Sequence, residues 1–197
     1  ISSESFVDNK KLVTGKLGED DWTKIAAASA ALNQTQILID DNPSLSVADM
    51  NAKCRRVDNL GLVVIDYLQL MTSAGGPQRS GDNRQQIVSD ISRALKIMAK
   101  ELNVPVVCLS QLSRGPESRS DKRPMLSDLR ESGAIEQDAD IVMFLYRDDY
   151  YNDDSENHNL AECIIAKNRH GETRTVELQW LPEYTTFSSI DRRHEEY

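Results

Sequence analysis

Residues 62–65 most constrain how this chain folds, because they read Leu-Val-Val-Ile and run directly into Asp66. Such a run is too short for a buried helix, and its β-branched residues favour a strand covered on both faces, as in a parallel sheet. Asp66 then lies at the carboxyl end of the strand, the edge where open α/β sheets bind ligands, so its carboxylate can hold Mg²⁺ beside a phosphate. The alternative is a strand that simply ends in a turn residue.

Composition narrows the class of protein. The chain has 197 residues, 39% hydrophobic and 28% charged, as expected for one substantial globular domain. No apolar run approaches the length of a membrane span, so we expect a cytoplasmic protein without a membrane partner. A net charge of −9 excludes a general electrostatic attraction to nucleic acid and leaves only a local contact. Three widely spaced cysteines favour reduced thiols over disulfides or a zinc site.

Hydrophobic periodicity predicts alternating helices and strands. The clearest helix spans residues 84–102, where Ile87, Ile91, Leu95 and Met98 recur on one face. Two further helices are predicted over 19–32 and 46–57, the second opened by Ser46 and Asp49 as a capping box. The predicted strands cover residues 36–41, 62–65, 106–109, 139–145, 160–168 and 173–181.

The order strand, long loop, helix, strand over residues 62–109 is typical of a right-handed crossover between parallel strands. The second of these strands runs directly into Ser110 and Gln111. Because the carboxyl ends of parallel strands meet at one edge, Asp66 and Gln111 are predicted to lie on the same edge of the sheet.

Two groups of cations stand out in this acidic chain. The loop 112–125 is locally basic and contains Arg114. Lys167 and Arg169 come at the tip of the predicted hairpin, on the same side of the strand because side chains alternate with a period of two. Such a pair can reach an anion on a neighbouring molecule, or can simply be exposed edge charges that discourage aggregation between sheets.

Together these features have the layout of a RecA-like ATPase core, and nearly the whole chain resembles the C-terminal ATPase domain of DnaB-type bacterial replicative helicases. The resemblance is carried, in order, by residues 52–56, 64–70, 83–86, 109–114, 121–124, 130–133, 135–142 and 144–149. It implies an α/β fold of the RecA-like P-loop NTPase class. This class has a mostly parallel central sheet flanked by helices, here with a C-terminal antiparallel hairpin.

The resemblance also implies ATP and Mg²⁺ as cofactors and a role for each predicted site residue. Asp66 matches the Walker B aspartate that supports Mg²⁺ at the ATP phosphates. Gln111 matches the sensor whose amide donates to the γ-phosphate. Lys167 and Arg169 match the cationic pair that reaches the ATP of the adjacent subunit, where the planar fork of arginine suits charge spread over phosphoryl oxygens.

A further implication concerns DNA. Arg130, Glu131 and Gly133 match the family's channel loop that follows the backbone of single-stranded DNA, and Arg114 of the basic loop is assigned to the same contact. The family works as a homo-hexamer, so six copies of a short basic segment can line a pore while the outer surface stays acidic. Single-stranded DNA, primase and a helicase loader are the partners that the resemblance implies for the full-length protein.

One motif of the family is missing. A nucleotide-binding core of this class needs Gly-x-x-x-x-Gly-Lys-Ser/Thr. Gly15-Lys16 is the only Gly-Lys pair, and it has Lys10 at the first glycine position and Leu17 at the hydroxyl position. The resemblance places the P-loop strand, its helix and the catalytic glutamate before Ile1. We therefore expect residues 1–197 to be a partial domain of a longer protein, unable alone to bind ATP tightly or to hydrolyse it.

The leading hypothesis is ATP-dependent unwinding of duplex DNA at the replication fork by a hexameric helicase. Another RecA-like ATPase, such as a recombinase or a phage primase-helicase, shares the aspartate and glutamine but is less expected to carry residues 130–142. A non-catalytic DNA-binding or assembly module is the alternative of a different class. A metal-dependent nuclease is disfavoured, since no pair of acids lies at matched strand ends.

Overall fold

The computed structural model describes residues 1–42, 45–71 and 84–190, with the backbone alone at Arg84 and at residues 130–132. It has the predicted α/β architecture, with one parallel sheet and one sheet that contains an antiparallel pair. The chain divides into two compact units, one of Ile1–Asp40, Leu145–Ile164 and Arg174–Tyr197, the other of Asp41–Phe144 and Ile165–Thr173. None of its described helices has the length and apolarity needed to cross a bilayer.

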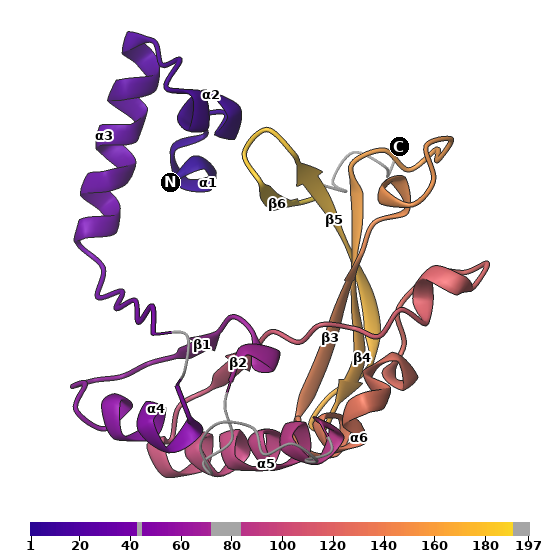
Figure 1. The fold of residues 1–197 in the computed structure, drawn as a ribbon. Helices are drawn as coiled ribbons and strands as arrows, with labels where there is room; N and C mark the ends of the chain where they lie inside the picture. Colours follow the sequence, from indigo (N-terminus) through magenta and orange to yellow (C-terminus); the bar gives the residue numbers. More distant parts are fainter. Residues whose placement is uncertain (43–44, 72–83, 191–197) are drawn as a thin grey trace. The chain divides into compact units, whose positions relative to one another are not determined.

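The parallel sheet belongs to the second unit and consists of β1 (Val63–Ile65) and β2 (Val106–Cys108). Val63 lies opposite Val106, and Ile65 lies opposite Cys108. The helices α4 (Val47–Cys54) and α5 (Arg84–Leu102) lie on one face of this pair (Figure 1). The bounds of α5 confirm the prediction made from its apolar stripe.

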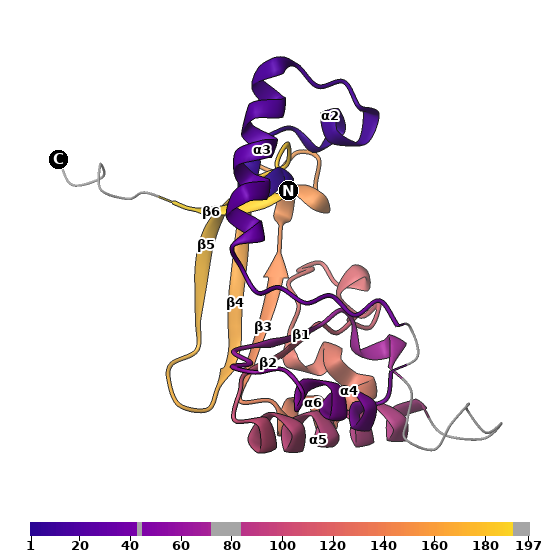
Figure 2. The same ribbon diagram turned by 90° about the vertical axis from the view of Figure 1, so that its left-hand side faces the viewer.

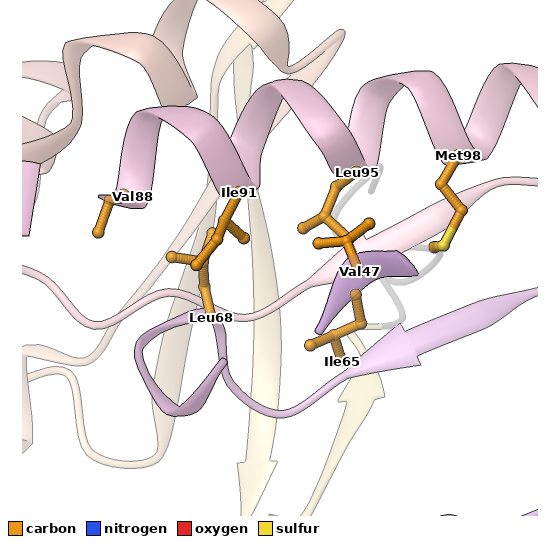
Figure 3. Close-up of a cluster of buried hydrophobic side chains, with 7 residues drawn as sticks. All are labelled: Val47, Ile65, Leu68, Val88, Ile91, Leu95 and Met98. Atoms are coloured by element: carbon orange, nitrogen blue, oxygen red, sulfur yellow. The ribbon is translucent and has the colours of Figure 1, made fainter. Parts of the chain in front are cut away.

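One apolar core holds these elements together. Val47 of α4, Ile65 of β1 and Leu68 point toward the stripe of α5 formed by Val88, Ile91, Leu95 and Met98 (Figure 3). Met98 is only 1% exposed. Burying each such side chain stabilises the fold by about 1.5–3 kcal/mol, so the core fixes the strands on the helix.

The prediction that both faces of the parallel strands are covered is wrong within the described chain. Val64 of β1 remains 61% exposed and Val107 of β2 remains 40% exposed. Successive side chains of a strand point to opposite faces, and α5 covers only the face that carries Ile65. Among the described residues, the apolar side chains of Val64 and Val107 on the other face therefore remain exposed.

The second sheet has four strands in the order β3, β4, β5, β6. Their bounds are Ile141–Tyr146 for β3, Leu160–Asn168 for β4, Arg174–Leu181 for β5 and Thr186–Ser189 for β6. Within β3, every second side chain is buried, as expected for a strand with one covered face. The predicted hairpin strands are observed as β4 and β5. β6, which was not predicted, pairs antiparallel with β5.

Short helices fill the connections. Among the described residues, those in the 3₁₀ conformation are η1 (Leu68–Leu70), η2 (Pro116–Ser118), η3 (Leu126–Ser132) and η4 (Asp148–Tyr150). The six-residue α6 (Gly133–Asp138) follows η3 directly and leads into β3. It lies beside one end of α5 (Figures 1 and 2).

The first unit begins with three helices, α1 (Ser2–Ser5), α2 (Asn9–Thr14) and α3 (Glu19–Asn33). α3 confirms the predicted helix, and its Asp21 accepts two hydrogen bonds from Lys11 of α2, the shorter at 2.9 Å. α1 and α2 were not predicted, because they are too short to show a helical period.

The predicted strand over residues 36–41 is wrong. These residues are assigned to no helix or strand, and Ile37, Leu38 and Ile39 are 65%, 72% and 89% exposed. A strand needs an edge to pair with, and no described strand pairs with this segment. The prediction was wrong because it relied on apolar composition and did not consider whether a partner strand is present.

Candidate functional site

The carboxyl ends of β1 and β2 lie side by side and carry the two polar residues predicted there. The backbone N–H of Leu109 donates to the carbonyl oxygen of Ile65 at 2.9 Å, and that of Leu68 donates to Leu109 at 2.9 Å. These bonds extend the parallel pairing just beyond both strands. Asp66 and Gln111 therefore leave the sheet at the same edge, which confirms the prediction of their shared position.

Both side chains are available to a ligand. Asp66 and Gln111 are solvent-exposed, and a cis peptide bond joins Asp66 to Tyr67. Within the described ranges, neither the Asp66 carboxylate nor the Gln111 side-chain amide makes a hydrogen bond or an ion pair. The edge thus presents one anionic oxygen ligand and one neutral amide, which can accept and donate hydrogen bonds.

Gln69, which sequence reasoning missed, ties the two strand ends together. From η1 its side-chain Nε2 donates to Ser110 Oγ at 3.1 Å and to the Gln111 carbonyl at 3.3 Å. Its Oε1 accepts from the Gln111 backbone N–H at 3.2 Å. One amide therefore satisfies both backbone groups of Gln111, and the segment after Asp66 is fixed to the segment that carries Gln111. No local pattern reveals this contact, because it joins segments far apart in the sequence.

The donor set at this edge fits Mg²⁺ better than a metal that needs several protein ligands. In the part of the chain that the structure describes, no three His, Cys, Asp or Glu side chains gather to hold a metal ion. Mg²⁺ keeps several waters and commonly takes only one or two carboxylates together with substrate phosphates. The single exposed carboxylate of Asp66 is compatible with that mode of binding.

Lys167 and Arg169 both turn toward the C-terminal end of α6. Lys167 Nζ donates to the carbonyl oxygens of Glu136 and Ala139, the latter at 2.7 Å. Arg169 Nη2 donates to the carbonyl oxygen of Gln137 at 2.7 Å. The last carbonyls of a helix have no donors within the helix, so cations are suitable partners. The two cations share one side, as the period of two predicts.

Asp140, which the sequence did not single out, lies among these cations. Its Oδ2 forms an ion pair with Lys96 of α5, and its Oδ1 lies 3.7 Å from Arg169 Nε. Its carbonyl oxygen accepts from the Arg169 backbone N–H at 2.9 Å. The hydrogen bond from Lys96, and then the charges of Lys96 and Arg169, hold the pKa of Asp140 below its usual value. Asp140 is therefore ionised at neutral pH.

The turn that follows Arg169 is tightly closed. Asn168 Oδ1 accepts from the His170 N–H at 3.3 Å, and Asn168 Nδ2 donates to the Glu172 carbonyl at 3.4 Å. A Cβ added at Gly171 would come within 2.6 Å of that Nδ2. The side chain of Asn168 thus closes the turn, while those of its two neighbours in sequence bind α6.

An ion pair orders the basic loop 112–125. Arg119 forms two hydrogen bonds of 2.7 Å with the carboxylate of Asp128, which is 4% exposed. The Asp128 side chain also accepts from Met125 N–H at 2.8 Å, and its carbonyl accepts from Ser113 N–H at 3.1 Å. Arg119, and in addition the Met125 N–H, lower the pKa of Asp128. Asp128 of η3 therefore anchors both ends of the loop.

The structure describes the side chains of only some of the residues that are predicted to contact DNA. Arg114 is exposed on the basic loop. Gly133 is the first residue of α6, and a Cβ placed there would meet no atom within 4 Å. Packing against the described atoms therefore does not require a glycine at this position. The side chains of Arg130 and Glu131 lie outside the described part of the structure, so their roles stay predictions.

Comparison with known proteins gives consistent results. The family described as DnaB-like helicase C terminal domain matches residues 1–189. The chain is 55% identical to the replicative DNA helicase DnaB of Geobacillus stearothermophilus and 53% identical to the replicative DNA helicase DnaC of Bacillus subtilis. Both matches cover all of this chain and 43% of the relative, so the chain spans less than half of their length.

A solved structure of a DnaB-like replicative helicase, described together with its interactions with primase, is also similar. It matches with a TM-score of 0.89 and 44% identity over 96% of this chain and 47% of its own. The fold class predicted from the sequence, a RecA-like ATPase core of this type, is confirmed.

Proposed function

Because the chain belongs to the family of DnaB-like helicase C-terminal domains, we propose that it forms part of the ATPase motor of a replicative DNA helicase. In the full-length protein, ATP hydrolysis drives the unwinding of duplex DNA at the replication fork. The observation that carries the proposal is the shared edge of Asp66 and Gln111 at the end of a parallel strand pair. The names of the relatives support the same activity.

Asp66 and Gln111 have complementary roles at the ATP phosphates. Asp66 would hold Mg²⁺, which would supply positive charge to neutralise the phosphoryl oxygens. Gln111 donates its amide to the γ-phosphate and loses that acceptor after hydrolysis, so its side chain distinguishes the two states. Gln69 keeps the Gln111 backbone fixed to the segment after Asp66. The sequence has no Gly-x-x-x-x-Gly-Lys-Ser/Thr motif, so another part of the full-length protein supplies the phosphate cradle.

Lys167 and Arg169 act on the nucleotide of the adjacent subunit in a homo-hexamer. In the isolated chain, carbonyls of α6 accept their hydrogen bonds. Phosphoryl oxygens are charged and form stronger hydrogen bonds than neutral carbonyls, so a neighbouring γ-phosphate can replace them. The guanidinium of Arg169 then stabilises the charge that spreads over the transferring phosphoryl group.

Single-stranded DNA binds to the segment that begins at Arg114 and ends at Gly133. Arg130 and Arg114 supply guanidinium groups for phosphates, and Gly133 allows close approach of the backbone. The loop starts one residue after Gln111 and is anchored to η3 by Asp128, so a change at the γ-phosphate has a short covalent and hydrogen-bonded path to this segment. Primase and a helicase loader are the proposed protein partners of the full-length chain.

Replacing Arg169 with Ala in the full-length protein tests the proposal. We expect ATP turnover stimulated by single-stranded DNA to fall by roughly 10³ to 10⁵, as for other trans-acting arginines. ATP binding, followed with a fluorescent analogue, should not change, because the residues that bind each nucleotide belong mainly to the other subunit. The matched control is Arg174→Ala, since Arg174 is an exposed arginine of the same hairpin.

Two results would contradict the proposal. Normal turnover in Arg169→Ala would remove the trans-acting role. Loss of ATP binding with retained turnover per bound nucleotide would assign Arg169 to binding within its own subunit instead.

A further inference from the structure

Asp140 connects three elements around the trans-acting cations. It follows α6, precedes β3, pairs with Lys96 of α5 and contacts Arg169 at the end of β4 through both its side chain and its carbonyl oxygen. We propose that Asp140 is a positioning residue for Arg169, with Lys96 as the residue that holds Asp140 in place. The inference rests on the proposed function of Arg169 and adds a residue to that site.

The geometry leaves the reactive side of the guanidinium available. Asp140 Oδ1 faces Nε, the nitrogen nearest the backbone, at 3.7 Å. Nη2 donates to the Gln137 carbonyl, a neutral acceptor that a phosphate can replace. Guanidinium groups have five N–H donors, so a contact at Nε fixes the plane of the group without occupying its outer edge. Asp140 thus orients Arg169 through Nε, on the backbone side of the guanidinium.

Asp140 also positions Arg169 without neutralising it. One carboxylate is shared between two cations, Lys96 and Arg169, so the cluster keeps a net positive charge. Within the described part of the chain, the hydrogen bonds of the second nearby cation, Lys167, go to neutral carbonyls. An arginine paired with a carboxylate of its own would lose most of its attraction for phosphate. The shared arrangement therefore suits a group that must remain attractive to an anion.

The alternative is that Asp140 only forms a structural ion pair between α5 and the hairpin. Hexameric rings assembled from two kinds of variant subunit distinguish the two roles. Each ATP site combines Asp66 of one subunit with Arg169 of the next. A mixture of Asp66→Ala and Arg169→Ala full-length subunits should therefore contain intact sites, about one quarter of the total for random equal mixing around a ring. A mixture of two variants that are both defective in the trans part contains none.

We expect Asp140→Asn, which keeps the size of the side chain, to lower the kcat of DNA-stimulated ATP turnover roughly tenfold to a hundredfold, the usual effect of losing a group that orients a functional side chain. The KM for ATP should not change, because the nucleotide-binding residues are intact. Mixing Asp140→Asn with Asp66→Ala should raise turnover above that of either variant alone. Mixing Asp140→Asn with Arg169→Ala should not raise turnover in this way. Lys96→Gln should show the same pattern with a smaller loss.

Asp58→Asn is the matched control, since Asp58 is an exposed aspartate of the same unit. It should turn over ATP normally. The inference is overturned if Asp140→Asn complements Arg169→Ala, if it raises KM with kcat unchanged, or if its turnover equals that of the unmodified protein. If Asp66→Ala and Arg169→Ala fail to complement each other, the trans role of Arg169 is itself wrong, and the role of Asp140 is overturned with it.

Discussion

The strand edge with Asp66 and the hairpin end with Arg169 are held by different physical means. The edge rests on a cluster of seven buried apolar residues, and any displacement there opens cavities in a close-packed core. The hairpin end is held by helix carbonyls and one shared carboxylate. Polar contacts can be exchanged for other polar partners at a small net cost. The comparison indicates a fixed edge, which we propose binds nucleotide, and a pair of cations whose hydrogen-bond acceptors can be exchanged.

The largest expected effect tests whether the edge is fixed by apolar packing. Leu95→Ala removes the centre of the α5 stripe and should destabilise the second unit by about 2–5 kcal/mol, the usual cost of a core cavity. Hydrogen exchange of the α5 amides in the full-length protein measures this loss. Ile97→Ala on the same helix is the control, because Ile97 is 51% exposed. Equal losses in the two variants would contradict the contrast drawn between the edge and the hairpin end.

A smaller effect is expected where the fixed edge depends on polar contacts. Gln69→Leu leaves the backbone N–H and carbonyl of Gln111 without their side-chain partner, at a cost of about 1 kcal/mol. We expect lower kcat for ATP turnover with little change in KM, because Gln111 loses its fixed position and not its amide. Gln86→Leu is the control, since Gln86 is exposed and, among the described residues, donates to Asp90 on its own helix.

An unchanged kcat in Gln69→Leu would show that apolar packing alone positions Gln111. That result would sharpen the contrast between the two regions, and it would remove Gln69 from the site.

Local patterns were sufficient to predict the elements of the fixed edge. The apolar stripe over residues 84–102 defined α5, and the strand-crossover-strand order put Asp66 and Gln111 on one edge. Lys167 and Arg169 were placed on one side by the period of two. In each case the information lies within a few residues of the feature, or follows from the way parallel strands are connected.

Contacts between distant segments could not be predicted. Gln69 meets Gln111, and Lys96 meets Asp140, only because the fold brings them together. The strand expected over residues 36–41 failed for a related reason, because a strand forms only where another edge accepts its hydrogen bonds. Sequence patterns therefore predicted candidate site residues, and not the residues that contact them from distant segments.

The smallest expected effect concerns the exchangeable region and its dependence on pH. The folded-state pKa of Asp140 is lowered chiefly by Lys96. Its ion pair therefore stabilises the fold fully above the unfolded pKa, near 3.8, and this contribution disappears as the pH falls through the lower folded-state value. The carboxylate is 45% exposed, so solvent and salt reduce the effect to less than about 1 kcal/mol.

Asp140→Asn should accordingly be slightly less stable than the unmodified protein at pH 6. The difference should begin to shrink as the pH falls below 3.8, vanish below the folded-state pKa of Asp140, and be smaller in high salt. Urea unfolding midpoints at several pH values measure it. Arg169 and His170 also face this carboxylate and contribute, after Lys96, to the lowered pKa of Asp140. A difference in unfolding free energy of several kcal/mol that does not change with salt concentration would instead show that the hairpin end is held as rigidly as the strand edge.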